Sequence, residues 1–200
     1  MKHKTKYLIY YAVFMSVVLG GSIALAYRLD TIVYSLAIII GAILVPSALQ
    51  GVFWHELFLG RRYLEKGQWV KAAESFRVFL DKLEKKPWLK HLVWLRWARF
   101  TGNVKAMALS NLGVAELNRG NVKEADQHFR KASELDSNYP VAYFNLAVIS
   151  MLRDNKTEAK SFLQKARNLG YGRTDYTQLQ VIASSLQKKM SRETSDRHAG

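Results

Sequence analysis

Side chains that could support acid–base catalysis or bind a metal ion are few and scattered in this 200-residue chain. No cysteine occurs, which excludes disulfides, thiol catalysis and cysteine metal sites. The sequence contains neither a glycine-rich phosphate loop nor a nucleophile motif. The five histidines lack the spacing of metal ligands; they are His3, His55, His91, His128 and His198. We therefore expect no catalytic residue, no metal site and no cofactor.

One adjacent pair, His55-Glu56, has the side chains that proton transfer requires. The pair lies at the end of a long apolar run, where such residues are more typical of helix-end packing. We therefore favour a protein that is not an enzyme. A membrane enzyme that uses the pair is an alternative hypothesis, which replacement of both residues by alanine would test.

The first quarter of the chain contains two long runs without a charged side chain, residues 7–27 and 31–54. At about 1.5 Å per residue, a helix of either length covers the roughly 30 Å hydrocarbon core of a bilayer. The sequence thus predicts a transmembrane helical hairpin in residues 1–52, with spans at about 7–27 and 31–50. Because positively charged flanks favour the cytoplasmic side, we expect a two-pass membrane protein with both termini cytoplasmic, in the inner or plasma membrane if it is bacterial. The flanking cations are Lys2, Lys4, Lys6, Arg61, Arg62 and Lys66.

An alternative interpretation takes residues 1–26 as a cleaved signal peptide, with Ala24-Leu25-Ala26 as the small-residue cleavage pattern. The second run would then still cross the membrane inward. Both versions place the remainder of the chain in the cytoplasm.

The remainder of the chain repeats itself at an interval of thirty-four residues. Each unit has a helical pattern, a turn and a second helical pattern. Small alanines in the second helix allow close packing of its neighbour. The residues that correspond at this interval are Leu112 and Leu146, Gly113 and Ala147, Ala125 and Ala159, and Ala132 and Ala166.

This period and these residue types resemble the tetratricopeptide repeat, a helix-turn-helix unit of thirty-four residues. The resemblance covers units 53–86, 106–139 and 140–173, and unit 140–173 departs from the motif with Ala147 and Asp154 where glycine is usual. The motif residues are Leu59, Gly60, Tyr63, Gly67, Ala72 and Phe76, then Leu112, Gly113, Gly120, Ala125, Phe129 and Ala132, then Leu146, Ala147, Ala159, Leu163 and Ala166.

The resemblance implies an all-α fold after the hairpin, an α-solenoid of about three helix pairs within residues 53–187. Terminal repeats need a solvating cap, and the amphipathic segment 174–187 is the expected capping helix. The polar residues 188–200 are expected to be a disordered tail.

A Trp-rich insertion, 87–105, separates the first unit from the second. Tryptophan and arginine together favour the boundary between water and lipid, so one hypothesis is a helix that lies on the membrane. The alternative is that the same aromatic residues are buried against the repeats. The residues concerned are Trp88, Trp94, Trp97, Arg96 and Arg99.

Repeat stacks of this family are similar in having a concave groove, lined by the first helix of each pair, that binds peptides or helices. The expected lining is chiefly apolar, which favours an apolar or helical segment of a protein partner. The two asparagines Asn111 and Asn145 could bond a peptide backbone at the edge. The alternative is that the Trp-rich insertion covers the groove. The expected groove residues are Ser110, Asn111, Val114, Asn118, Val141, Phe144, Asn145, Val148 and Met151.

The chain has a net charge of +14, of which residues beyond 60 contribute twelve because residues 1–60 hold four Lys or Arg and two Asp or Glu. Such an excess attracts acidic partners and anionic lipid. We expect a membrane-anchored interaction scaffold that recruits or helps assemble partner proteins, with protein and membrane lipid as partners and no prediction of oligomeric state. The alternative function is charge-driven binding of anionic lipid or nucleic acid. Because no nucleic-acid-binding module is present, nucleic acid is not an expected partner.

Overall fold

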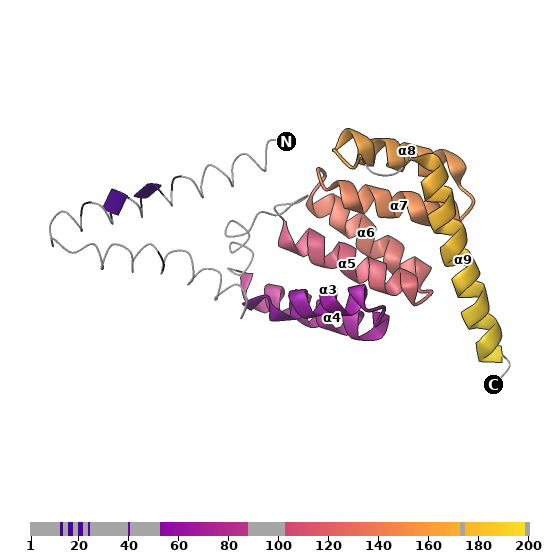
Figure 1. The fold of residues 1–200 in the computed structure, drawn as a ribbon, viewed down its shortest axis with the longest axis horizontal. Helices are drawn as coiled ribbons and strands as arrows, with labels where there is room; N and C mark the ends of the chain where they lie inside the picture. Colours follow the sequence, from indigo (N-terminus) through magenta and orange to yellow (C-terminus); the bar gives the residue numbers. More distant parts are fainter. Residues whose placement is uncertain are drawn as a thin grey trace.

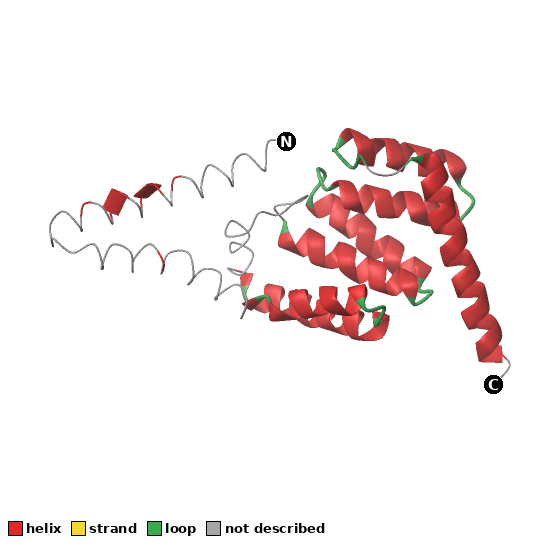
Figure 2. Cartoon of the chain, in the orientation of Figure 1, coloured by secondary structure: helices red, strands yellow, loops and turns green. Residues whose placement is uncertain are grey.

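The computed structural model describes residues 53–87, 103–172 and 175–198, with side chains to residue 192, and seven isolated positions before residue 41. Within each continuous part the chain is helical, and successive helices are joined by short turns (Figure 2). The helices of the continuous parts are α3 (His55–Glu65), α4 (Trp69–Lys85), α5 (Val104–Asn118), α6 (Val122–Leu135), α7 (Pro140–Leu152), α8 (Lys156–Asn168) and α9 (Tyr176–His198) (Figure 1).

The first six of these helices form three pairs that stack in chain order (Figure 1). We call α3, α5 and α7 the A helices, and α4, α6 and α8 the B helices. Within a pair the A and B helices pack on each other, and the B helices α4 and α6 also pack on the A helix of the next pair. This arrangement is the all-α stack of helix pairs that the sequence predicts for this part of the chain.

Each A helix ends in the same tight turn. The residue that closes the turn has a positive φ: 68° at Gly67, 83° at Gly120 and 56° at Asp154. Aspartate enters this left-handed region more readily than most residues with a side chain, which explains how unit 140–173 forms the turn without glycine. In all three turns the next residue donates its N–H to the carbonyl five residues earlier at 2.9 Å: Gln68 to Tyr63, Asn121 to Glu116 and Asn155 to Ser150.

Close contact between an A helix and its B helix depends on one small residue in each A helix. A Cβ at Gly60 would lie 2.8 Å from the ring of Phe76, and a Cβ at Gly113 would lie 2.5 Å from the ring of Phe129. Both distances are too short for a real contact, so the rings occupy the space that a side chain would need. The motif glycines are thus explained by the buried phenylalanines that face them.

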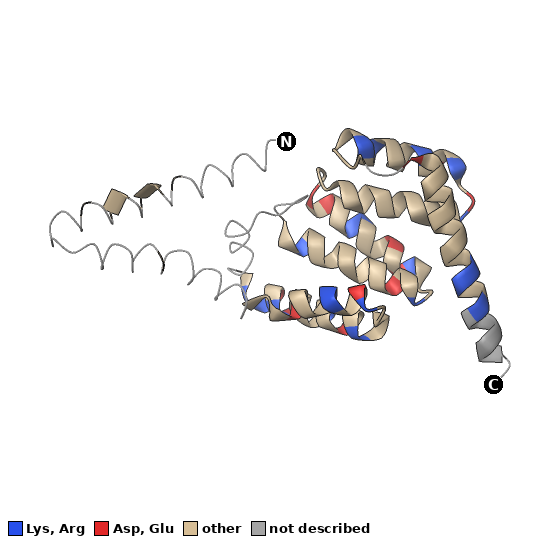
Figure 3. Cartoon of the chain, viewed as in Figure 1, with Lys and Arg blue, Asp and Glu red and all other residues tan. Residues whose placement is uncertain are grey.

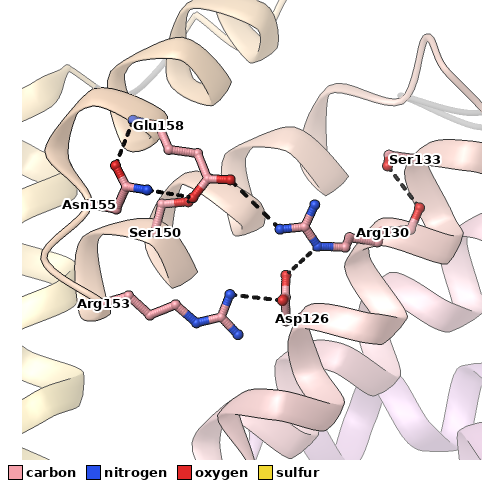
Figure 4. Close-up of polar contacts among 7 residues, drawn as sticks. All are labelled: Asp126, Arg130, Ser133, Ser150, Arg153, Asn155 and Glu158. Atoms are coloured by element: carbon pink, nitrogen blue, oxygen red, sulfur yellow. Dashed lines mark hydrogen bonds and ion pairs between the residues drawn. The ribbon is translucent and has the colours of Figure 1, made fainter.

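Neighbouring pairs are also joined by ion pairs at matching positions, and Figure 4 shows the one between the second and third pairs. Arg77 on α4 reaches Glu124 on α6 at 3.8 Å, and Arg130 on α6 reaches Glu158 on α8 at 3.7 Å. Both arginines thus connect one B helix to the next at the same place in the repeat. Asp126 strengthens the second junction, because it accepts from Arg130 at 3.0 Å and from Arg153 at 2.9 Å.

The transmembrane hairpin in the predicted fold class and the two-pass localisation are contradicted. Within the described part of the chain, none of the helices combines the length and the apolar composition that a membrane span needs. The most apolar of them, α7, has 13 residues, or about 20 Å against the roughly 30 Å required. The longest, α9, has 23 residues but carries several lysines and arginines. The predicted spans 7–27 and 31–50 fall, apart from isolated positions, outside the described residues.

Two other predicted segments remain to be compared with the structure, the Trp-rich insertion and the C-terminal end of the chain. The Trp-rich insertion, with Trp88, Trp94, Trp97, Arg96 and Arg99, lies outside the described residues except at its ends. At the C-terminal end, a helix is present where the sequence predicted a short cap and a disordered tail. This helix, α9, begins at Tyr176 and continues to His198.

Candidate functional site: the A-helix face and α9

The nine predicted groove residues all lie on two neighbouring A helices, α5 and α7. The structure therefore brings them together, but at different depths. Ser110, Phe144, Asn145 and Val148 are buried. The half-buried residues are Asn111, Val114, Asn118, Val141 and Met151.

Ser110 and Asn145 are engaged with each other rather than exposed on this face. The Asn145 amide nitrogen donates to the Ser110 hydroxyl oxygen at 3.3 Å, and both residues are buried. Tyr139 lies in the same place: burial raises the pKa of its hydroxyl to about 12, and its hydrogen bond with Ser110 opposes that shift. These contacts tie α5 to α7, so they serve the junction between units.

Four of the five apolar residues of the predicted groove belong to a hydrophobic cluster that also contains residues of α9, whereas Val141 packs on another cluster. Phe144 stacks on Tyr171, with ring centroids 4.6 Å apart and 25° between the ring planes. Val148 is buried in the cluster, and Val114 and Met151 are half-buried against it. We call these four side chains, Val114, Phe144, Val148 and Met151, the α9 seat.

Helix α9 packs on the A helix α7 and runs across the stack from the third unit toward the first (Figure 1). Its buried residues are Leu179 and Ala183, with Leu186 half-buried in the same cluster. These positions are separated by four and three residues, so they lie on one side of the helix. The predicted groove is thus covered by the chain's own C-terminal helix.

The far end of α9 makes a polar contact with the first and second units. The Lys189 ammonium donates to the backbone carbonyl of Asn118, the last residue of α5, at 3.0 Å. The same ammonium lies 4.8 Å from the ring centroid of Trp69, the first residue of α4. A helix C-terminus and an aromatic face both attract a cation. We call this contact the Lys189 latch.

Beside the latch is an open hollow of about 620 Å³ between two A–B turns. Two cations, Lys71 and Arg119, are among its lining residues, and no acidic residue is. Arg119 is paired with the fully buried Glu116 at 3.0 Å. The lining residues are Gly67, Gln68, Trp69, Val70, Lys71, Asn118, Arg119 and Asn121.

The residues considered for chemistry are dispersed. His55 is exposed, and the Glu56 carboxylate accepts from Lys82 of α4 at 3.1 Å, a contact that holds α3 on α4. His128 lies on the B helix α6 and is half-buried. Across the residues that the structure describes, no three histidine or carboxylate side chains are grouped as metal ligands would be.

Two residues of this site were missed in the sequence. Tyr171, in the connection between α8 and α9, covers Phe144. Lys189 was assigned to a disordered tail, because the polar sequence after residue 187 has few apolar residues to mark a helix. The signal available was the apolar spacing of Leu179 and Leu186, which Met190 continues by four more residues.

The comparison with family models identifies one unit of the stack. Residues 107–139 match the family model described as Tetratricopeptide repeat. The match covers nearly all of α5 and α6, and it supports a protein that contains tetratricopeptide repeats. A repeat of this family indicates a protein–protein interaction module, and such modules are typically not catalytic. A search of curated proteins finds no match to the chain.

Proposed function

We propose that the repeat stack binds a helical segment of a partner protein on its A-helix face and thereby recruits or assembles partner proteins. The tetratricopeptide repeat at residues 107–139 supports the general function, protein–protein interaction. The observation that carries the more specific proposal is α9, because an amphipathic helix already packs on this face.

The chemistry of the seat favours an apolar helix over a polar peptide. The four seat residues, Val114, Phe144, Val148 and Met151, are all apolar, and the buried residues of α9 that share their cluster are apolar as well. Burial of one leucine-sized side chain contributes about 1.5–3 kcal/mol. A helix that presents apolar residues three and four positions apart, as α9 does, delivers several such side chains to one groove.

The alternative of charge-driven binding has less support. The stack carries lysines and arginines on all three pairs, but acidic residues lie among them (Figure 3). Several of the arginines are already paired inside the protein: Arg77 with Glu116 at 2.6 Å, Arg119 with Glu116, and Arg130 and Arg153 with Asp126. The excess positive charge is therefore assigned to faster encounter with acidic surfaces of a partner rather than to the main affinity.

Site-specific photo-crosslinking in the full-length protein tests the proposal. A photoreactive residue would replace Asn111 or Met151, which are half-buried on A helices, and Val78, which is 50% exposed on α4, as the matched control. We expect cross-links to a partner from the A-helix positions and none from Val78. The cross-linked partner peptide should have apolar residues at helical spacing, and capture should persist in 0.5 M NaCl because an apolar contact is not screened.

Two results would contradict the proposal. Cross-links that form from Val78 and not from the A helices would place binding on the B-helix side. Capture that disappears at 0.5 M NaCl would favour charge-driven binding, since the affinity for a polyanion falls steeply with salt. A variant such as Phe144→Glu is unsuitable here, because Phe144 is only 8% exposed and a charge at that position would disrupt the stack.

A further inference from the structure

We propose that α9 is an intramolecular occupant of the partner site, and that the Lys189 latch keeps it in place. The inference rests on the proposed function and deepens it in two respects. It states how access to the site is controlled, and it states which kind of helix the partner presents.

The first supporting observation is that α9 packs on the core of the third pair, through Leu179, but takes no part in the core of the first pair. The described residues form three hydrophobic clusters. Only one of them, the cluster that contains the seat, includes residues of α9. The clusters around Phe76 and around Ala132 contain no residue of α9. Removal of α9 from its seat would therefore leave the contacts between α3, α4, α5 and α6 in place.

The second observation concerns the side of α9 that faces away from the stack. Val181 is 62% exposed and Ile182 is 36% exposed, although both are large apolar side chains. Among the α9 side chains that the structure describes, only Leu179 and Ala183 are buried. The helix is thus held by a narrow apolar strip, a type of contact that a second helix can replace.

The third observation is the Lys189 latch at the far end of α9. Lys189 is half-buried, and the residues it touches, Asn118 and Trp69, lie on two other units of the stack. Its neighbour Lys188 has the same charge but is exposed. Because Lys189 is ten residues beyond Leu179, its contact fixes the direction of α9 across the A helices. Loss of this contact would weaken the far end of α9, while the apolar strip and Tyr176, whose ring centroid lies 5.1 Å from the Lys160 ammonium, still hold its first turns on the third unit.

The occupant displays the pattern that a partner helix must have. In α9 a large apolar residue, Leu179, is followed by a small residue four positions later, Ala183, and by a second large one, Leu186, three positions after that. A cation, Lys189, comes three positions further on. We assign the site to an amphipathic helix of a partner protein with this pattern, because the small residue allows close approach and the cation reproduces the latch.

A labelled peptide of residues 175–198 provides a probe of stated sequence. It would be titrated by fluorescence anisotropy into full-length wild-type protein and into the variants Lys189→Ala and Lys188→Ala. We expect weak binding to the wild type, because the intramolecular helix fills the seat and lowers the competent fraction. Lys189→Ala should bind the peptide at least fivefold more tightly, whereas Lys188→Ala should match the wild type.

A change in the peptide separates seat binding from non-specific attraction. The same peptide with Ala183→Glu keeps the exposed residues Val181 and Ile182 and the cation but cannot pack its buried strip, so we expect no measurable binding. In the chain itself, Ala183→Glu should open the seat further than Lys189→Ala. If that variant does not fold, the peptide affinity of Lys189→Ala still tests whether α9 occupies the seat.

Hydrogen exchange of the full-length protein without peptide gives an independent measurement. In Lys189→Ala we expect faster exchange of the α9 amides and unchanged exchange in α4 and α6. In Lys188→Ala the exchange of α9 should equal that of the wild type. Equal exchange and equal peptide affinity in all three proteins would overturn the latch and the self-occupancy.

Other results would overturn the assignment of the occupant. Concentration-dependent dimers of Lys189→Ala in sedimentation velocity would make the occupant the α9 of a second copy. Equal binding of the wild-type and Ala183→Glu peptides would show attraction by charge rather than by the seat. If photo-crosslinks form on the A helices while Lys189→Ala changes nothing, the inference fails and the proposed function stands. If no cross-link to a partner forms on the A helices even when α9 is released by Lys189→Ala, the proposed function fails as well.

Discussion

At the scale of single residues, the repeat motif pairs one residue of the A helix with one residue of the B helix, and the sizes of the two side chains are complementary. Gly113 faces the ring of Phe129 with no space for a methyl group, and the unit after it has alanine and leucine at the same two places, Ala147 and Leu163. A larger residue on the A helix thus accompanies a smaller one on the B helix. The two positions in each unit must be treated as one packing unit.

We expect Gly113→Ala to destabilise the protein by about 1–2 kcal/mol. The added methyl group would lie 2.5 Å from the Phe129 ring, and overpacking of this kind costs about 1–3 kcal/mol, while alanine in place of glycine returns up to about 1 kcal/mol in helix propensity. Urea unfolding followed by circular dichroism would measure the change.

The double variant Gly113→Ala/Phe129→Leu is the matched test, because it reproduces the pair Ala147 and Leu163. It should recover most of the stability lost in Gly113→Ala, since residues in contact show coupling energies of about 0.5–3 kcal/mol. Additive losses in the double variant would contradict the paired-size explanation.

A second residue-scale feature is a histidine whose protonation opposes folding. His128 is half-buried, and its Nδ1 is buried without a hydrogen-bond partner among the described residues. Burial lowers its pKa below the usual 6.5; Lys131 and Arg77 act in the same direction, and Glu116 and Glu124 oppose it. Below about pH 6.5 the unfolded chain therefore binds a proton that the folded chain binds less readily.

The free energy of unfolding should accordingly fall as the pH is lowered from 7.5 through 6.5 to 5.5. The variant His128→Gln should lose less stability over the same interval, because it has no group to protonate there. Most carboxylates titrate below this range and do not contribute. Urea unfolding of both proteins at each pH gives the comparison, and identical pH slopes would show that His128 is not responsible.

At the scale of elements, matching ion pairs connect one B helix to the next. Arg77 and Arg130 each reach a glutamate on the following B helix, and Arg130 also contacts Asp126. The Asp126 side chain is 13% exposed and the Arg130 side chain 46%, so these contacts are screened by solvent only in part. They fix the position of neighbouring pairs in addition to the apolar contacts.

We expect Arg130→Gln to destabilise the stack by about 1 kcal/mol, since it removes charge-assisted hydrogen bonds at a partly buried junction. The control is Lys85→Gln, which breaks an exposed pair with Asp81 within one helix and should change the stability by less than about 0.5 kcal/mol. Thermal unfolding of the two variants would rank them. Equal effects would mean that the junction contributes no more than a surface ion pair.

At the scale of the whole molecule, net charge opposes compaction. The chain carries +14 at neutral pH, and one of the acidic residues that could offset it, Glu116, is paired inside the protein with Arg77 and Arg119. Repulsion among the remaining exposed cations acts over roughly 10 Å at 0.1 M salt and over less at higher salt. Glu116 is fully buried, so its ion pairs with Arg77 and Arg119 are screened less than charges that are exposed on both sides.

An increase in NaCl from 0.05 to 0.5 M should therefore raise the free energy of unfolding of the full-length protein. Urea is the suitable denaturant, because it carries no charge and leaves the ionic strength to the salt. A decrease in stability would mean that the ion pairs between units outweigh the repulsion, and that the paired arginines dominate the electrostatics of the fold.

Much of the helix-pair stack could be predicted from the sequence because its contacts are local. The turn at Gly120, the small residue Gly113 and the ring of Phe129 lie within one unit, so their spacing is visible as a pattern. The predicted units 106–139 and 140–173 contain the pairs α5–α6 and α7–α8, apart from the first two residues of α5. The hydropathy of residues 7–27 led to a predicted span, and no helix described by the structure meets that requirement.

The composition of the site was decided by tertiary contacts. Ser110 and Asn145 are 35 residues apart and bond each other, and Lys189 bonds Asn118 across 71 residues. No periodicity in the chain indicates such contacts, because they depend on how the units stack and on the direction that α9 takes. The sequence by itself determined where the helices of the repeat units lie and which small and large residues meet within a pair. Only the tertiary structure decided that the apolar groove is covered by α9, since two surfaces far apart in the chain must meet before either is buried.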